Sequence, residues 1–288
     1  MVALLHTSIK DSDMKRKTIR ECIRTGLVGL LISGGFCASV YATPTTHIWT
    51  PSTDIQPYGK IHITADYYFP TAPRDHAGNR TFVQQVYGVA FSLLSDKPEE
   101  NLLGKLWSPL GKVMGEVGFD CKKGLGSTLD NWPLYAHFKF AVPEDAYFKN
   151  MPAFAVGMYD IGYKRDFTNN NLAYYKFAKT FYMPSSGSKF NLGRFSAGYF
   201  DGNSKTLLDE DGRPDDSGPM FAWERVMSEI SDRLWICVDY QGTHSAYGAM
   251  NYGFSWKFNN NVSVILGYDK FNNADLADTI TFQIDIDF

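Results

Sequence analysis

The chain has 288 residues, with 28 Lys and Arg against 31 Asp and Glu and a formal net charge of −3 at pH 7. This acidic balance argues against nucleic acid as a partner, because binding to phosphates requires a basic surface. No P-loop, dinucleotide-binding, zinc or haem-attachment motif occurs, so we expect no cofactor. The sequence places Cys121 and Cys237 far apart and matches no metal-ligand spacing.

The first 42 residues have the parts of a secretory signal. A basic stretch follows Met14, a short apolar core follows Thr25, and Val40-Tyr41-Ala42 has the small-residue ending of a cleavage site. The apolar core is shorter than the roughly 20 residues that a spanning helix needs. We therefore predict a signal peptide over 1–42, with Met14 as a possible true start.

Two other interpretations of this region stay open. Cys37 suggests a lipoprotein, but Phe36 stands where a lipobox has a small residue. An uncleaved N-terminal anchor is the other. After residue 42 no apolar run is long enough for a transmembrane helix. Residues 43–58 contain Pro51 and Pro57, which disfavour a central strand, so we predict a periplasmic or lumenal leader there.

The rest of the chain, 59–288, alternates apolar and polar residues in segments of about ten residues, the length of a tilted membrane strand. We predict an all-β fold, an antiparallel up-and-down transmembrane barrel of about 12 strands (10–14). The predicted strands are 59–69, 81–94, 112–121, 132–141, 153–164, 173–182, 189–200, 219–228, 233–241, 246–257, 261–270 and 278–288. Arg194, Glu224 and Arg225 obscure the alternation in the sixth to eighth strands. A soluble periplasmic β-sandwich is the alternative fold.

The connections and the aromatic residues agree with a barrel. Longer polar loops follow the odd strands, and short turns such as Ser231-Asp232 follow the even ones, except at 95–111, where we expect a helical turn, and at 142–151. Outward aromatic residues gather near strand ends and predict two belts at the two membrane interfaces. The predicted outer belt is Tyr67, Phe69, Phe119, Tyr163, Tyr199, Tyr240 and Tyr268, and the inner belt is Phe138, Phe140, Trp256, Phe258 and Phe288.

The opposite face of the same strands predicts a polar lumen. Its candidate lining residues are Lys60, His62, Asp66, Glu116, Asp120, His137, Lys139, Asp239, Lys257, Asp269, Asp285 and Asp287, with Lys164 and Asp160 as further members. Both signs occur and neither dominates enough to name a solute charge. A lining of an open pore and a set of paired charges in a filled lumen are both compatible with this pattern.

Other candidate chemistry is weak. Asp209 and Asp211 before Gly212 faintly suggest calcium, but the spacing and closing Glu of a calcium loop are absent, so a solvated turn-rich loop is favoured. No lipid-facing His stands beside a Ser on a neighbouring strand, and no Gly-x-Ser-x-Gly motif occurs. We therefore assign no catalytic residue, and His62 and His137 count as polar lumen residues.

The last eleven residues, 278–288, are the most informative segment. Ile280, Phe282, Ile284, Ile286 and Phe288 alternate without a break against polar residues. Behind a secretory signal, such a strand resembles the closing strand of a bacterial outer-membrane β-barrel, and a terminal Phe288 resembles the assembly signal of that class. The class resemblance implies the outer membrane of a Gram-negative bacterium, contact with outer-membrane lipid, and recognition by the barrel-assembly machinery.

The closing strand should pair with 59–69, which would bring Lys60 and His62 to Asp285 and Asp287. Segments such as 49–54 and 267–269 resemble those of uncharacterised proteobacterial barrels, and no catalytic residue is carried over from them. The leading functional hypothesis is a porin-like passive channel for small polar solutes. A closed structural or adhesion barrel acting through its outer loops, chiefly 201–217, is the second, and a lipid-modifying enzyme is the third. The oligomeric state stays open.

Overall fold

A computed structural model describes residues 45–288 apart from 96, 127 and 186–187. The predicted signal peptide, its cleavage site and Met14 lie outside the described residues. None of the helices in the described part of the chain is both long and apolar enough to cross a bilayer.

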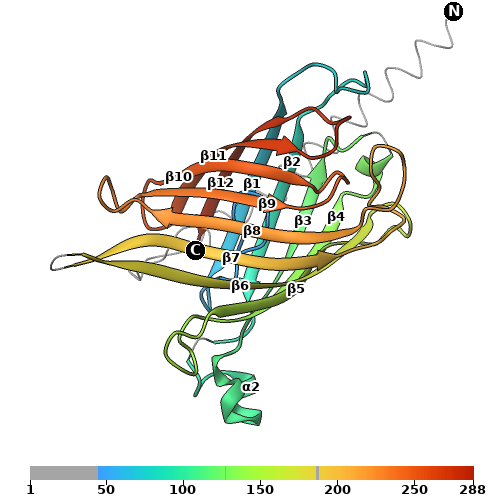
Figure 1. Ribbon diagram of the computed structural model, residues 1–288. Coiled ribbons are helices and arrows are strands. Elements are labelled where there is room, and N and C mark those ends of the chain that lie inside the picture. The colour runs from blue at the N-terminus through green and yellow to red at the C-terminus, as the bar shows by residue number, and fades with distance from the viewer. Residues whose placement is uncertain (1–44, 96, 127, 186–187) are drawn as a thin grey trace, which may run out of the picture. The chain divides into compact units, whose positions relative to one another are not determined.

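Residues 61–287 form twelve antiparallel strands that close into one barrel (Figure 1). Each strand pairs with its neighbours in the sequence, and β12 pairs with β1. The prediction of a 12-stranded barrel is confirmed, and the alternative of a β-sandwich is wrong. The strands are β1 (Ile61–Pro70), β2 (Gln84–Ser92), β3 (Met114–Lys123), β4 (Leu134–Val142), β5 (Ala153–Gly162), β6 (Asn169–Ser185), β7 (Ser188–Asp201), β8 (Ser217–Val226), β9 (Leu234–Gln241), β10 (Ala249–Lys257), β11 (Val262–Phe271) and β12 (Thr279–Asp287).

The barrel closes where its two chain ends meet. His62 lies opposite Asp287 and Phe69 opposite Ile280 in the antiparallel register. The Ile61 amide donates to the Phe288 carbonyl at 3.2 Å, and the Phe288 amide donates to the Ile61 carbonyl at 2.9 Å. Closure leaves no unpaired strand edge. We call this end of the barrel the terminal end and the opposite end the loop end.

Alternation divides the side chains between two environments. In β12, Thr281, Gln283 and Asp285 are at most 4% exposed on the inner face, while Ile280 is 49% exposed on the outer face. Large apolar and aromatic side chains cover the outside of the other strands too. Their burial in hydrocarbon contributes about 25 cal/mol per Å², and lipid is the environment that such an outer face requires. The exposed members include Phe69, Phe119, Tyr163, Tyr199 and Tyr268, and Phe138, Phe140, Trp256, Phe258 and Phe288.

Strands β6 and β7 differ from the prediction. They have 17 and 14 residues, longer than the ten expected, and their hairpin projects past the neighbouring strands (Figure 1). The register shifts between Phe181 and Tyr182. Such a bulge changes which face successive side chains occupy. This explains why strict alternation failed to place Arg194, whereas in β8 the adjacent charges Glu224 and Arg225 themselves obscure the alternation.

The long connection between β2 and β3 contains the expected helical turn. Helix α2 spans Leu102–Leu106 and is followed by a 3-10 turn, η2, at Ser108–Lys112. The Asn101 side chain caps α2 by accepting hydrogen bonds from the amides of the next turn. Leu106 and Trp107 are 83% and 63% exposed at the terminal end. A second 3-10 turn, η3 (Leu129–Asn131), lies between β3 and β4.

Candidate functional site

The N-terminal segment folds back inside the barrel as a hairpin, residues 45–56, which we call the lumen hairpin. The His47 amide donates to the Thr50 carbonyl at 2.8 Å, and Thr46 and Pro51 form an antiparallel bridge. The side chains of His47 and Thr50 are 1% and 0% exposed. Pro51 and a tight turn suit a segment that lies outside the strand ladder and whose polar groups bond to side chains of the barrel wall.

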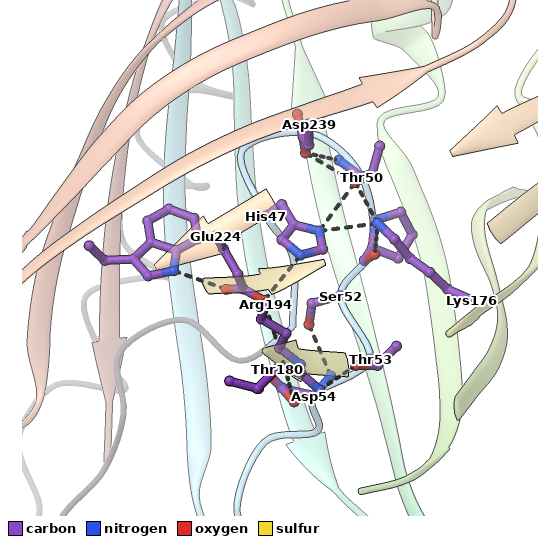
Figure 2. A network of polar contacts seen from close by, with 12 residues as sticks. His47, Thr50, Ser52, Thr53, Asp54, Lys176, Thr180, Arg194, Glu224 and Asp239 are labelled. Carbon is purple, nitrogen blue, oxygen red and sulfur yellow. Dashed lines mark hydrogen bonds and ion pairs between the residues drawn. The ribbon is translucent and has the colours of Figure 1, made fainter. Parts of the chain in front are cut away.

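Asp239 of β9 holds the tip of the lumen hairpin (Figure 2). Its Oδ2 atom accepts hydrogen bonds from the Trp49 amide at 3.0 Å, the Thr50 amide at 2.8 Å and the Thr50 hydroxyl at 3.0 Å. Its Oδ1 atom accepts one from Asn251 Nδ2 at 2.7 Å. Hydrogen bonds to an ionised acceptor are about twice as strong as neutral ones, so this buried carboxylate is a strong anchor.

Lys176 of β6 binds the other side of the same turn. Its ammonium group donates to Thr50 Oγ1 and the Pro51 carbonyl, both at 2.9 Å, and lies 3.2 Å from His47 Nδ1. Lys176 is fully buried. Three contacts match the three donors of an ammonium group. Oxygens of the lumen hairpin thus take the place of water around this lysine.

Arg194 of β7 fixes the descending arm of the lumen hairpin (Figure 2). Its Nη1 atom donates to both carboxylate oxygens of Asp54, at 2.7 and 2.6 Å, and Nη2 donates to Thr53 Oγ1 at 2.7 Å. Glu224 of β8 lies 3.4 Å from His47 Nε2 and 3.7 Å from Arg194. The neighbouring strands β7 and β8 therefore supply a base to one arm of the hairpin and an acid to the other.

The base of the lumen hairpin reaches the opposite wall. The Gln56 amide donates to Glu116 of β3 at 2.9 Å, and its side chain donates to Asp287 of β12 at 2.9 Å. Lys139 of β4 donates to the Thr45 carbonyl at 2.8 Å and lies 3.4 Å from Glu116. Both ends of the hairpin are therefore held by side chains of the barrel wall.

Apolar contacts complete the docking of the tip. Ile48 packs against Cys237 and Ile265, and Trp49 donates its indole N–H to the Tyr247 carbonyl at 2.8 Å. The Trp49 ring makes edge contacts with Tyr68 and Phe271 at centroid distances of 5.5 and 5.6 Å. Both residues bury apolar surface that the polar contacts alone would leave open to water.

A cavity of about 520 Å³ remains between the lumen hairpin and the wall formed by β12 and β1–β4. The inner face of this wall carries Gly88, Ala90 and Gly118, which pair across β1–β4 with Thr64, His62 and His137. Small side chains leave the space that larger ones would fill. The cavity is lined from Arg80 and Leu276 at the loop end to Glu116 and His62 near the terminal end.

Ion pairs stabilise much of the polar lining. Lys122 lies 2.6 Å from Asp160, and its ammonium group lies 5.1 Å from the centroid of the Tyr135 ring. His62 lies 2.9 Å from Asp287 and 3.3 Å from Asp285. The partner expected for the two terminal acids is thus present in His62. Lys60 makes no ion pair with them among the described residues, because it precedes β1 in the turn at the barrel rim.

The predicted lumen residues have three locations. The first group lines the cavity: His62, Asp66, Glu116, Asp120, His137, Lys139 and Asp285, together with Asp160. Asp239 and Asp287 contact the lumen hairpin, and Asp269 accepts a hydrogen bond from Thr279 at 2.7 Å. Lys60, Lys164 and Lys257 lie outside the cavity lining, near the ends of strands.

Sequence reasoning missed four charged residues of the lumen: Lys122, Lys176, Arg194 and Glu224. Lys122 continues the polar series of Glu116 and Asp120, so extending the third predicted strand by one residue would have found it. Arg194 and Glu224 face inward and lie opposite each other in the register. Arg225 faces outward, with its guanidinium 4.5 Å from the centroid of Phe190.

The carboxylate-rich loop 202–216 folds over the loop end of the β6–β8 wall. Leu207 is 1% exposed and packs with Leu172 and Met220 inside the barrel. Asp209 and Asp211 both pair with Arg213, and the described residues contain no cluster suited to a metal ion. Cys121 and Cys237 take part in no disulfide bond among the described residues.

Comparisons with solved structures return outer-membrane barrels. An outer-membrane channel from Pseudomonas putida F1 has a TM-score of 0.45 at 10% identity, over 82% of this chain and 98% of that one. The NanC porin has a TM-score of 0.41 at 8% identity, over 79% and 98% of the two chains. Omp33 from Acinetobacter baumannii has a TM-score of 0.38 at 12% identity, over 80% and 98%.

No protein-family model and no curated protein matches this sequence. The fold itself places the chain in a structural class. In a closed antiparallel ladder the backbone N–H and C=O groups of each strand bond to neighbouring strands, and an apolar outer face requires lipid around it. The chain is a transmembrane β-barrel of the outer-membrane type.

Proposed function

We propose that this chain is a passive channel for small polar solutes in the outer membrane of a Gram-negative bacterium. The passage runs between the lumen hairpin and the wall of β12 and β1–β4. The observation that carries the proposal is the cavity of about 520 Å³ along this wall, with its ion-paired polar lining. A volume of this size accommodates a small solute.

The orientation of the barrel in the outer membrane follows from the same proposal. Both ends of the barrel chain meet at the terminal end, which in an even-stranded barrel faces the periplasm. The connections 71–83 and 202–216 then face outward, and the longer β2–β3 connection with α2 faces the periplasm. Phe288 would be read by the barrel-assembly machinery before insertion, and outer-membrane lipid would surround the apolar face.

Reconstitution in a planar bilayer tests the proposal. Folded protein, identified by its heat-modifiable migration on a gel, should give discrete conductance steps. A folded preparation that never conducts would overturn the proposal and favour a closed structural or adhesion barrel. Because Leu207 anchors loop 202–216 inside the barrel, adhesion would then have to use the remaining exposed surface of that loop.

A further inference from the structure

Carboxylates outnumber bases inside the barrel. Among the described strand residues that face inward, nine are acidic and five are Lys or Arg. The acids are Asp66, Glu116, Asp120, Asp160, Glu224, Asp239, Asp269, Asp285 and Asp287. The bases are Lys122, Lys139, Lys176, Arg194 and Lys257. Even with His62 and His137 charged, acids remain in excess.

The excess is concentrated in the wall beside the cavity. Asp285 is 3% exposed and lines the cavity; its Oδ1 atom lies 3.3 Å from His62, while its Oδ2 atom has no hydrogen-bond partner. Asp66 also lines the cavity, accepts a hydrogen bond from Thr64 at 2.5 Å, and has no ion-pair partner among the described residues. These two carboxylates are available to a cation that enters the cavity.

The strand register brings a third carboxylate to the same place. Thr64 lies opposite Asp285 on one side and Gly88 on the other, and Gly88 lies opposite Asp120. A Cβ atom at Gly88 would meet both Asp120 Oδ1 and Thr64 Cγ2 at 2.6 Å. Because Gly88 has no side chain, Asp120 and Thr64 both lie over it on the cavity wall. Asp120 lies 3.3 Å from His137, so it is partly neutralised.

The aromatic lining of the cavity also suits a cation. The Lys122 ammonium group lies 5.1 Å from the centroid of Tyr135 and 6.0 Å from that of Tyr247. The quadrupole of an aromatic ring attracts a cation placed over its face. Tyr68 and Trp49 line the same cavity. Aromatic rings and an excess of carboxylates together match the needs of a small ammonium ion better than those of an anion.

We propose that the passage selects small cations, including organic ammonium ions, and that Asp66 and Asp285 are its specificity-determining residues. This inference rests on the proposed channel function. In a low-dielectric lumen, an excess of carboxylates over bases raises the local concentration of cations and repels anions. The described residues provide no chelating cluster, so the cation would pass without being held as a structural metal.

The zero-current potential of the full mature protein in a planar bilayer, across a KCl gradient, tests this selectivity. We expect its sign to show K⁺ permeating several-fold better than Cl⁻, and the current to persist when methylammonium replaces K⁺. Asp66→Asn and Asp285→Asn should each lower the permeability ratio. Asp232→Asn removes the same charge from an exposed turn and should leave the ratio unchanged.

The outcomes separate the two proposals. Conducting wild-type protein with no selectivity, or with a preference for Cl⁻, would overturn the cation preference and leave the channel function standing. A selective channel whose ratio is the same in both variants would overturn the role of Asp66 and Asp285. Complete absence of conductance from folded protein would overturn the channel function and this inference together.

Discussion

The two halves of the lumen share one strand pattern but differ in what their inward side chains do. The β6–β11 half carries Lys176, Arg194 and Asp239, whose long or charged side chains bind the lumen hairpin. The β1–β4 half carries Gly88 and Gly118 and borders an unfilled cavity. Side-chain volume and pairing, and not strand geometry, thus decide which half is closed and which offers a passage.

Deleting residues 45–56, with Pro44 joined to Pro57, should reduce the difference between the two halves of the lumen more than any other change. The hairpin is not part of the closed ladder of β1–β12, so the ladder should persist without it. We expect a several-fold rise in single-channel conductance, because the filled half would open to water and leave Lys176 and Asp239 solvated. Gel heat-modifiability would check that the barrel has folded.

A control keeps the length of the segment and removes its contacts. Replacing 45–56 by a Gly/Ser sequence of equal length should also raise the mean conductance, but with larger fluctuations, because a flexible chain does not stay docked. Unchanged conductance in both variants would mean that the hairpin does not limit the passage.

Asp239→Ala should loosen the hairpin without deleting it. The substitution removes three hydrogen bonds from the tip and leaves its buried donors without an acceptor. Truncating one partner of a buried, hydrogen-bonded charge costs about 3 kcal/mol. The time spent in a high-conductance state should therefore rise by roughly a hundredfold, since about 1.4 kcal/mol corresponds to a factor of ten.

The matched variant is Asp239→Asn. Its amide oxygen still accepts from the hairpin, so we expect a smaller increase than for Asp239→Ala. Equal single-channel records for the wild type and both variants would show that Asp239 does not hold the tip.

Gly88→Leu should narrow the open half. The new side chain would point into the cavity and displace Thr64 and Asp120, and Asp120 would have to leave its contact with His137. Conductance should fall by about half or more, as expected when an interior side chain fills a small barrel. Val89→Leu, one residue along the same strand but on the outer face, adds a single methylene toward lipid and should leave the conductance unchanged.

The separation along the sequence between contacting residues decides which parts of the fold and of the site could be predicted. Period-two alternation in 278–288 and in the other predicted strands located the strands, because one face of each strand contacts lipid and the other faces the lumen. The lumen hairpin was beyond sequence reasoning, because its binding joins Thr50 to Asp239, 189 positions away. Arg194 was missed because the register shift beside it interrupts the local alternation. Lys176 was missed because the inward face that it shares carries the apolar residues Leu172 and Tyr174.

The smallest expected effect lies in loop 202–216, above the filled half. Hydrogen bonds from the Arg213 amide and the charge of its guanidinium hold the pKa of Asp209 below its usual value. A lowered folded-state pKa means that the ionised form favours the folded loop. This stabilisation is present above the unfolded pKa of about 3.9 and is lost as the pH falls through the folded-state pKa.

Hydrogen exchange of the Arg213 amide measures this effect directly. Asp209→Asn should speed exchange at pH 7, and the wild-type protein should lose its protection only in acid. Asp216→Asn, in the same loop but without an ion pair among the described residues, should behave like the wild type. Because Asp209 does not line the cavity, none of these changes should alter conductance. A drop in conductance with Asp209→Asn would instead show that the filled half of the lumen also carries solute.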